Sequence, residues 1–95
     1  MPVTVVAQIT AKAEYRDFIQ SELIKLVAPT RQEKGCIEYR LHQDLDDPVL
    51  FLFFETWEDR ISLERHLASE HFKQYVVAVT PYIDDKTVRI MTSIA

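Results

Sequence analysis

The spacing of hydrophobic residues changes repeatedly along this chain, and each change marks a predicted strand or helix. Alternating apolar and polar residues are typical of half-buried strands, whereas apolar residues three or four apart are typical of amphipathic helices. Strands are predicted at residues 3–10, Cys36–Gln43, Leu50–Trp57 and 86–94. Helical spacing predicts helices at residues 15–28, 59–68 and 69–80.

The connections between these segments contain residues that end helices or form turns. Pro29 is expected to end or kink the first helix near residue 28, because the residue before a proline disfavours helical backbone angles. Gly35, the only glycine, is expected to be a left-handed C-cap. Residues 44–48 hold three aspartates and a proline, which is typical of a turn and predicts a hairpin between the flanking strands. Ser69 is predicted to cap the last helix and Pro81 to close it.

The predicted order of elements, β-α-β-β-α-β, is that of a ferredoxin-like α+β fold. It has an antiparallel sheet with helices on one face, and residues 1–95 form one domain.

The strand Leu50–Trp57 is apolar on both faces, with Leu50, Leu52 and Phe54 on one side and Phe51, Phe53 and Trp57 on the other. A sheet face in water should carry polar side chains. We therefore expect the open face to be buried in a homodimer.

Composition and charge exclude several classes of partner. Hydrophobic residues make up 47% of the chain, and the formal net charge is -4. A nucleic-acid or anionic-membrane surface needs a basic stripe, so neither partner is expected. No apolar run approaches the ~20 residues of a membrane span, and the first residues do not form a signal peptide. Cys36 is the only cysteine and cannot form an internal disulfide, so a cytoplasmic location is expected.

Two histidines, His66 and His71, are the first candidates for catalysis. Histidine titrates near neutral pH and can transfer protons or bind a metal. Their spacing of five residues differs from the i,i+4 spacing of paired zinc ligands on a helix, and no further His or Cys cluster is present. We therefore predict no metal site. For either histidine, a structural position at the surface or in a hydrogen bond is the alternative to catalysis.

A second group of candidates shares one face of the strand Leu50–Trp57, and comprises Phe51, Phe53, Glu55 and Trp57. The aromatic residues could fill the core or form a flat wall for a planar ligand. Glu55 needs a partner, because burying an unpaired carboxylate costs on the order of several kcal/mol. The candidate partners are Arg40, Arg89, a histidine and a phenolic substrate.

Other residue types add little chemistry. Tyr75 lies four residues after His71 and shares its helix face. Cys36 has no obvious base nearby and is expected to be a small buried hydrophobe rather than a nucleophile. The chain has no glycine-rich phosphate loop, so neither a nucleotide nor a bound flavin is expected.

The stretch that contains these candidates resembles the antibiotic biosynthesis monooxygenase (ABM) family, especially its quinol-monooxygenase-like members. The pattern is Glu-x-Trp-x-Asp followed by His-x-x-x-x-His-Phe, present here as Glu55, Trp57, Asp59, His66, His71 and Phe72. Residues 33–48, EKGCIEYRLHQDLDDP, are also similar to the family's Gly-Cys strand and acidic turn. The resemblance covers nearly the whole chain.

This resemblance implies a dimeric α/β-barrel with a cleft between the helices and the sheet. It implies that His66 and His71 line this cleft. It also implies oxidation of phenols or quinols by molecular oxygen without metal, haem or flavin. Phe53 stands where polyketide-oxidising members have Asn. The haem-degrading branch has Trp, His and Asn at the positions of His66, Val76 and Gln8, so haem degradation is not expected.

Three hypotheses of function follow. The first is a cofactor-independent monooxygenase that oxidises a quinol or polyphenol with molecular oxygen, with His66 and His71 as catalytic residues. Its small aromatic substrate would contact Glu55, Trp57, Phe72, Tyr75, Phe51 and Phe53. The second is an isomerase or lyase that uses a histidine as acid and base. The third is a non-catalytic dimer that binds a hydrophobic ligand, such as a stress protein.

Overall fold

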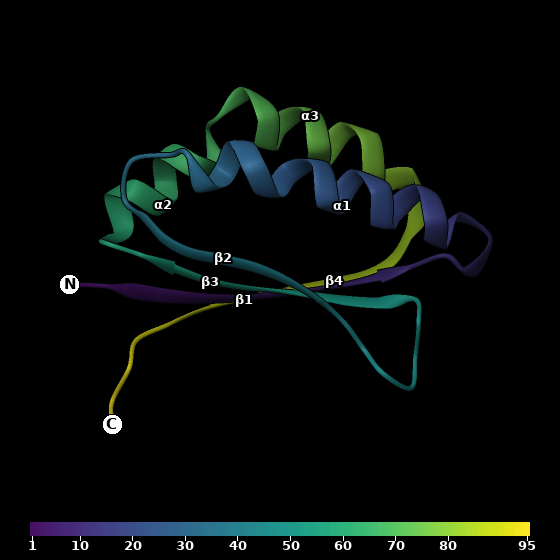
Figure 1. The fold of residues 1–95 in the computed structure, drawn as a ribbon, viewed down its shortest axis with the longest axis horizontal. Coiled ribbons are helices and arrows are strands. Elements are labelled where there is room, and N and C mark those ends of the chain that lie inside the picture. Colours follow the sequence, from purple (N-terminus) through teal and green to yellow (C-terminus); the bar gives the residue numbers. More distant parts are fainter.

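A computed structural model describes residues 1–95 as a four-stranded antiparallel sheet with three helices on one face, and the other face bare (Figure 1). The strands are β1 (Val3–Ala11), β2 (Cys36–Gln43), β3 (Leu50–Trp57) and β4 (Ile83–Met91). The helices are α1 (Arg16–Arg31), α2 (Arg60–Leu67) and α3 (Glu70–Val79). The strand order β2-β3-β1-β4 completes the predicted ferredoxin-like α+β fold.

The core lies between the sheet and the helices, and strand alternation determines which residues reach it. Odd-numbered residues of β1 and β3 face the helices and are buried or half-buried, and the register sets Val5 opposite Glu55 and Ile9 opposite Phe51. Even-numbered residues such as Leu52 and Phe54 lie on the open face. The predicted division of β3 into two apolar faces is therefore confirmed.

The predicted end of the first helix was wrong. The helix α1 contains Pro29 and continues to Arg31. Proline has a backbone φ angle that suits a helix, and near the last turn its missing N–H removes only one hydrogen bond. Gly35 does have the predicted positive φ, at 90°. It is not the helix cap, because that position is Gln32 in right-handed conformation.

Two strand predictions also need correction. β4 begins and ends three residues before the predicted segment, at Ile83 and Met91. The strand β4 pairs with β1, and the pairing ends where Thr4 of β1 lies opposite Met91. The last four residues of the chain therefore have no partner strand. In β2, a bulge between Cys36 and Glu38 makes Ile37 an extra residue. Ile37 is therefore exposed, although the alternation of Ile37, Tyr39 and Leu41 along this strand predicts that it faces the core with Tyr39.

No helix of the chain is both long enough and apolar enough to cross a membrane.

Candidate active site

An apolar pocket lies between the sheet and the helices α2 and α3, and encloses about 50 Å³. Eleven of its 14 lining residues are hydrophobic, and the others are Glu55, His66 and Lys86. The edge strand β4 contributes the exposed residues Val88 and Ile90. Because its walls are apolar, the pocket suits a hydrophobic ligand and places that ligand beside a few ionisable groups.

Glu55 is the buried carboxyl group of this pocket, with only 4% of the residue exposed. It accepts a hydrogen bond from the indole N–H of Trp57, with an Nε1–Oε1 distance of 3.0 Å. Burial raises the pKa of Glu55 to about 7, and the hydrogen bond from Trp57 opposes part of that rise. A carboxyl group with such a pKa can donate or accept a proton near neutral pH.

The arginine partners considered for Glu55 are wrong. Arg40 forms an ion pair with Glu38, with an Nε–Oε2 distance of 2.8 Å. Arg89 lies opposite Val6, an even-numbered residue of β1, and so belongs to the open face. The indole of Trp57 was not considered as a donor, because a tryptophan in an apolar strand reads first as a packing residue.

His66 reaches the pocket from the last turn of α2 and is 1% exposed. The helix begins at a cap, where the side chain of Asp59 accepts a hydrogen bond of 2.8 Å from the backbone N–H of Ser62. The imidazole packs between aromatic rings, with centroid distances of 4.8 Å to Trp57 and 4.9 Å to Phe72. Burial lowers the pKa of His66, so the side chain is neutral at pH 7 and available as a base.

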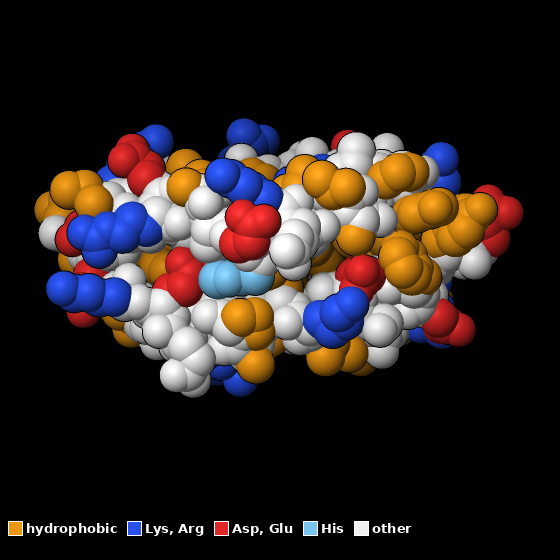
Figure 2. Space-filling view, turned by 90° about the horizontal axis from the view of Figure 1, so that it is seen from above, with side chains coloured by type: hydrophobic (Ala, Val, Ile, Leu, Met, Phe, Trp, Pro, Cys, Tyr) orange, Lys and Arg blue, Asp and Glu red, His pale blue; other side chains and the backbone are white.

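His71 lies in the first turn of α3, which Ser69 caps by accepting a hydrogen bond from Phe72. It does not line the apolar pocket. Its side chain is 29% exposed and faces a groove between α1 and α3 that also includes Glu22 and Lys25. Figure 2, which views the helix side, shows histidine atoms at the surface with carboxylates close by.

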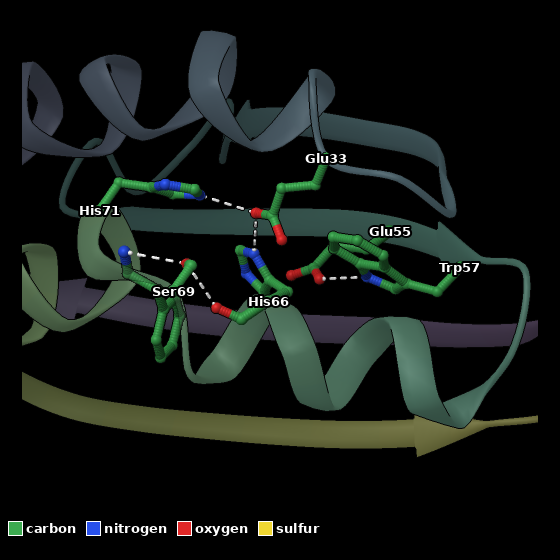
Figure 3. A network of polar contacts seen from close by, with 7 residues as sticks. Glu33, Glu55, Trp57, His66, Ser69 and His71 are labelled. Carbon is green, nitrogen blue, oxygen red and sulfur yellow. Dashed lines mark hydrogen bonds and ion pairs between the residues drawn. The ribbon is translucent and has the colours of Figure 1, made fainter.

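Glu33 connects the two histidines and was not among the predicted site residues. Its Oε2 atom lies 2.7 Å from Nδ1 of His66 and 2.7 Å from Nε2 of His71. Figure 3 shows the imidazole of His66 between the carboxyl groups of Glu33 and Glu55. The histidines are 33 and 38 residues away in sequence, so no local spacing reveals the contact. One sequence signal could have drawn attention to Glu33. It is the first residue of segment 33–48, which resembles the Gly-Cys strand and acidic turn of the ABM family.

A tight turn brings Glu33 to α2. The backbone N–H of Cys36 donates to the carbonyl of Glu33 at 3.2 Å, and the carbonyl of Gly35 accepts from Glu58 at 2.8 Å. A Cβ atom on Gly35 would lie 2.1 Å from Oγ of Ser62. Only glycine permits both this approach and the positive φ. The turn therefore rests directly on the helix that carries His66.

The structure separates the predicted site residues into two groups. The pocket is lined by Phe53, Glu55, His66, Phe72 and Tyr75. Three others lie outside its lining: Phe51, Trp57 and His71. Phe51 instead packs under α1 near Val27 and Leu41. Trp57 is fully buried and acts on the pocket through residues that line it, namely Glu55, His66 and Tyr39.

One group of side chains has the composition of a metal site. Glu33, His66 and His71 each offer one ligand atom, and these atoms lie within 4.8 Å of one another. Two histidines and a carboxylate can bind a divalent transition metal. The 2.7 Å separations from Glu33 are also the lengths of charge-assisted hydrogen bonds. The predicted absence of a metal stays a prediction.

Known proteins with similar sequences show which family has this arrangement. Residues 2–78 match the family described as antibiotic biosynthesis monooxygenase. Rv0793 of Mycobacterium tuberculosis is 35% identical over 74 residues, which cover 78% of this chain and 72% of that protein. The "Probable quinol monooxygenase YgiN" of Escherichia coli is 28% identical over 99 residues, with 94% and 95% covered.

The fold agrees with these matches. The crystal structure of PA3566 from Pseudomonas aeruginosa superposes with a TM-score of 0.94 at 37% identity, covering 99% of this chain and 95% of that one. A further relative, sll1783 of Synechocystis, is 31% identical, and the matched region is about half (51%) of that protein. The chain is therefore a member of the antibiotic biosynthesis monooxygenase family.

Proposed function

We propose that this protein is a cofactor-independent monooxygenase that oxidises a quinol or a similar polyphenol with molecular oxygen. The observation that carries this proposal is the pairing of Glu55 and His66 in one apolar pocket. Glu55 has a pKa of about 7, the neutral imidazole of His66 can accept a proton, and the walls suit a planar aromatic ring. The name of the relative YgiN, "Probable quinol monooxygenase", supports the same substrate class.

The proposed reaction begins with the removal of a hydroxyl proton. Neutral His66 takes this proton, and the resulting quinolate is electron-rich enough to reduce oxygen directly. One oxygen atom forms a bond to an open ring carbon, which loses its hydrogen, and the other oxygen atom leaves as water. The product is a hydroxyquinone, and the substrate supplies all the electrons that oxygen takes up. The protein therefore binds, deprotonates and orients the substrate.

The pocket must widen for this substrate. It encloses about 50 Å³, which is less than a bicyclic ring occupies. Its open side is formed by the exposed residues Leu67, Val88 and Ile90, whose side chains are free to move. We expect the aromatic ring of the substrate to enter through this open side and to stack against Phe72. This position would bring the hydroxyl group of the substrate to His66 and Glu55.

Oxygen consumption with a reduced naphthoquinol tests the proposal. The wild type should consume oxygen above the rate of autoxidation with no added cofactor. Loss of a positioned general base typically lowers the rate by about 10²–10⁴-fold, and we expect this loss for His66→Ala. His42→Ala is the matched control, because that histidine is exposed on β2, outside the pocket. A wild-type rate equal to autoxidation, or equal rates for wild type and His66→Ala, would contradict the proposal.

An isomerase or lyase reaction is a second candidate. The same pair favours it, because a neutral histidine beside a carboxyl group with a pKa of about 7 can remove a proton and return it elsewhere. An enolisable ketone turned over without oxygen, with a pH–rate profile that bends near 7, would favour this reaction over monooxygenation.

A further inference from the structure

We propose that Glu33 is the positioning residue of His66, and that His71 competes for the same carboxylate oxygen from outside the pocket. The charge on His71 would then control the strength of the base inside the pocket. This inference rests on the proposed function for its catalytic meaning, but the coupling of the three side chains can be measured without any substrate.

The hydrogen-bond geometry fixes the form of His66. A carboxylate only accepts hydrogen bonds, so an imidazole nitrogen 2.7 Å from Oε2 of Glu33 must carry the hydrogen. Neutral His66 is therefore protonated at Nδ1, and its Nε2 keeps a free lone pair. A base oriented by a carboxylate in this manner is a recurring arrangement in enzymes. When His66 takes up a proton, the negative charge of Glu33 stabilises the imidazolium.

His71 uses the same oxygen atom, also at 2.7 Å. A proton gained by His71 places a positive charge beside Glu33 and offsets the charge that His66 depends on. Glu33 raises the pKa of His66, whereas His71 lowers it. The two histidines thus share one carboxylate, and their ring centroids lie 6.2 Å apart, so a charge on His71 also acts on His66 directly.

The two histidines also differ in their access to solvent. The side chain of His71 is 29% exposed, in the groove between α1 and α3 near Glu22 and Lys25. His66 is 1% exposed. A solute in the groove can therefore contact His71 directly, whereas His66 meets the groove only through the shared carboxylate of Glu33 and the ring of His71.

Other ionisable groups also face His66, and the test must separate them from Glu33 and His71. From β2, the ring of Tyr39 lies 5.6 Å from His66, and burial raises the pKa of this phenol so far that it stays neutral. From β3, Glu55 titrates near pH 7. From β4, Lys86 lines the same pocket, with Nζ 5.9 Å from the ring centroid of Phe72. Cys36 lies near Glu33, and burial raises the pKa of its thiol to about 11. Glu55 is therefore the neighbour that the test must remove.

Ring-nitrogen NMR of the intact protein tests the coupling directly. The nitrogen shifts of His66 are followed with pH in the wild type, Glu33→Gln and His71→Gln, each also in a Glu55→Gln background. We expect the Nδ1–H tautomer in the wild type. The titration midpoint of His66 should fall in Glu33→Gln, with a mixture of tautomers. It should rise in His71→Gln, which keeps a neutral donor but cannot become charged.

Three results would overturn the inference. These are the Nε2–H tautomer in the wild type, an unchanged His66 midpoint in His71→Gln, or one metal ion per chain in the purified protein that is lost in Glu33→Gln. His71→Gln alters an exposed side chain and decides the question even where Glu33→Gln does not fold. Activity supplies a separate readout, with an expected loss of about 10²-fold in Glu33→Gln, because His66 would lose its orientation. Coupled titration without any oxygen consumption would retain the inference and reject the proposed function.

Discussion

Trp57 donates its indole N–H to the carboxyl group of Glu55, two residues earlier on the same face of β3, at 3.0 Å. Burial disfavours the charged carboxylate, and this hydrogen bond stabilises it. The balance leaves the pKa of Glu55 at about 7 rather than near 4.5. Trp57 thus tunes an ionisable group of the pocket without lining the pocket.

Stability should fall with pH because of Glu55. Its folded pKa of about 7 lies above the value of 4.5 for the free side chain, so the unfolded chain ionises first as pH rises. The resulting loss of stability develops between about pH 4.5 and 7 and amounts to about 3 kcal/mol above that range. Glu55→Gln removes it. Urea unfolding should show that, between pH 4 and 8, the free energy of unfolding of the wild type falls by about 3 kcal/mol relative to that of the variant. Parallel curves from pH 4 to 8 would contradict this prediction.

Gly35→Ala should destabilise the fold and displace Glu33. Alanine at a φ of 90° is strained, and its Cβ would overlap Oγ of Ser62. We expect a loss of at least about 2 kcal/mol in the free energy of unfolding. The double variant Gly35→Ala/Ser62→Gly removes the overlap but keeps the strain. Denaturant unfolding should therefore show that the double variant loses less free energy of unfolding than the sum of the losses in the two single variants. A loss equal to that sum would mean that the contact with Ser62 is unimportant.

We expect a homodimer at micromolar concentration, formed through the open face of the sheet. Phe54 lies on that face and is 37% exposed, near the half-buried residues Val6 and Leu52. Phe54→Asp would bury a charge in the interface and should prevent association. Val77→Asp is the control, because Val77 is an exposed apolar residue on the helix side. Sedimentation velocity should show a dimer for the wild type and the control, and a monomer for Phe54→Asp. A monomeric wild type would refute the expected dimer.

Lys86 should favour substrates that carry a negative charge. It is the only cationic residue lining the pocket, with Nζ 5.9 Å from the ring centroid of Phe72, and it forms no ion pair within the chain. In Lys86→Met, the KM for a naphthoquinol bearing a carboxylate should rise by up to about fivefold, as for a partly exposed ion pair. The KM for the uncharged naphthoquinol should stay the same. Equal changes for both substrates would assign Lys86 to packing alone.

Local patterns predicted the bounds of the first three strands and the helix starts closely, because these depend on neighbouring residues, whereas the last strand lies three residues earlier than predicted. Alternation along Leu50–Trp57 identified both faces of β3, and Ser69 identified the start of α3. The end of α1 was not predicted, because the effect of Pro29 depends on its position in the last turn. The bulge at Ile37 was missed for a similar reason, since it depends on pairing with β3 rather than on β2 itself.

The site was only partly predictable, because its key contacts join distant segments. The sequence identified both histidines and Glu55 as ionisable groups in apolar surroundings. It could not show that one histidine lines the pocket and the other the outer groove, because helix packing decides this. Glu33 was missed, since nothing in its turn predicts a partner 33 residues later.

The shared carboxylate also makes the site a reporter of complete folding. Glu33 precedes the β2–β3 hairpin, and both histidines follow it, so the contacts form only after the hairpin has packed and α2 has reached its place. A partly folded chain could contain every helix and still lack an oriented base. The tautomer of His66 would then distinguish the native state from compact intermediates that circular dichroism records as equally helical.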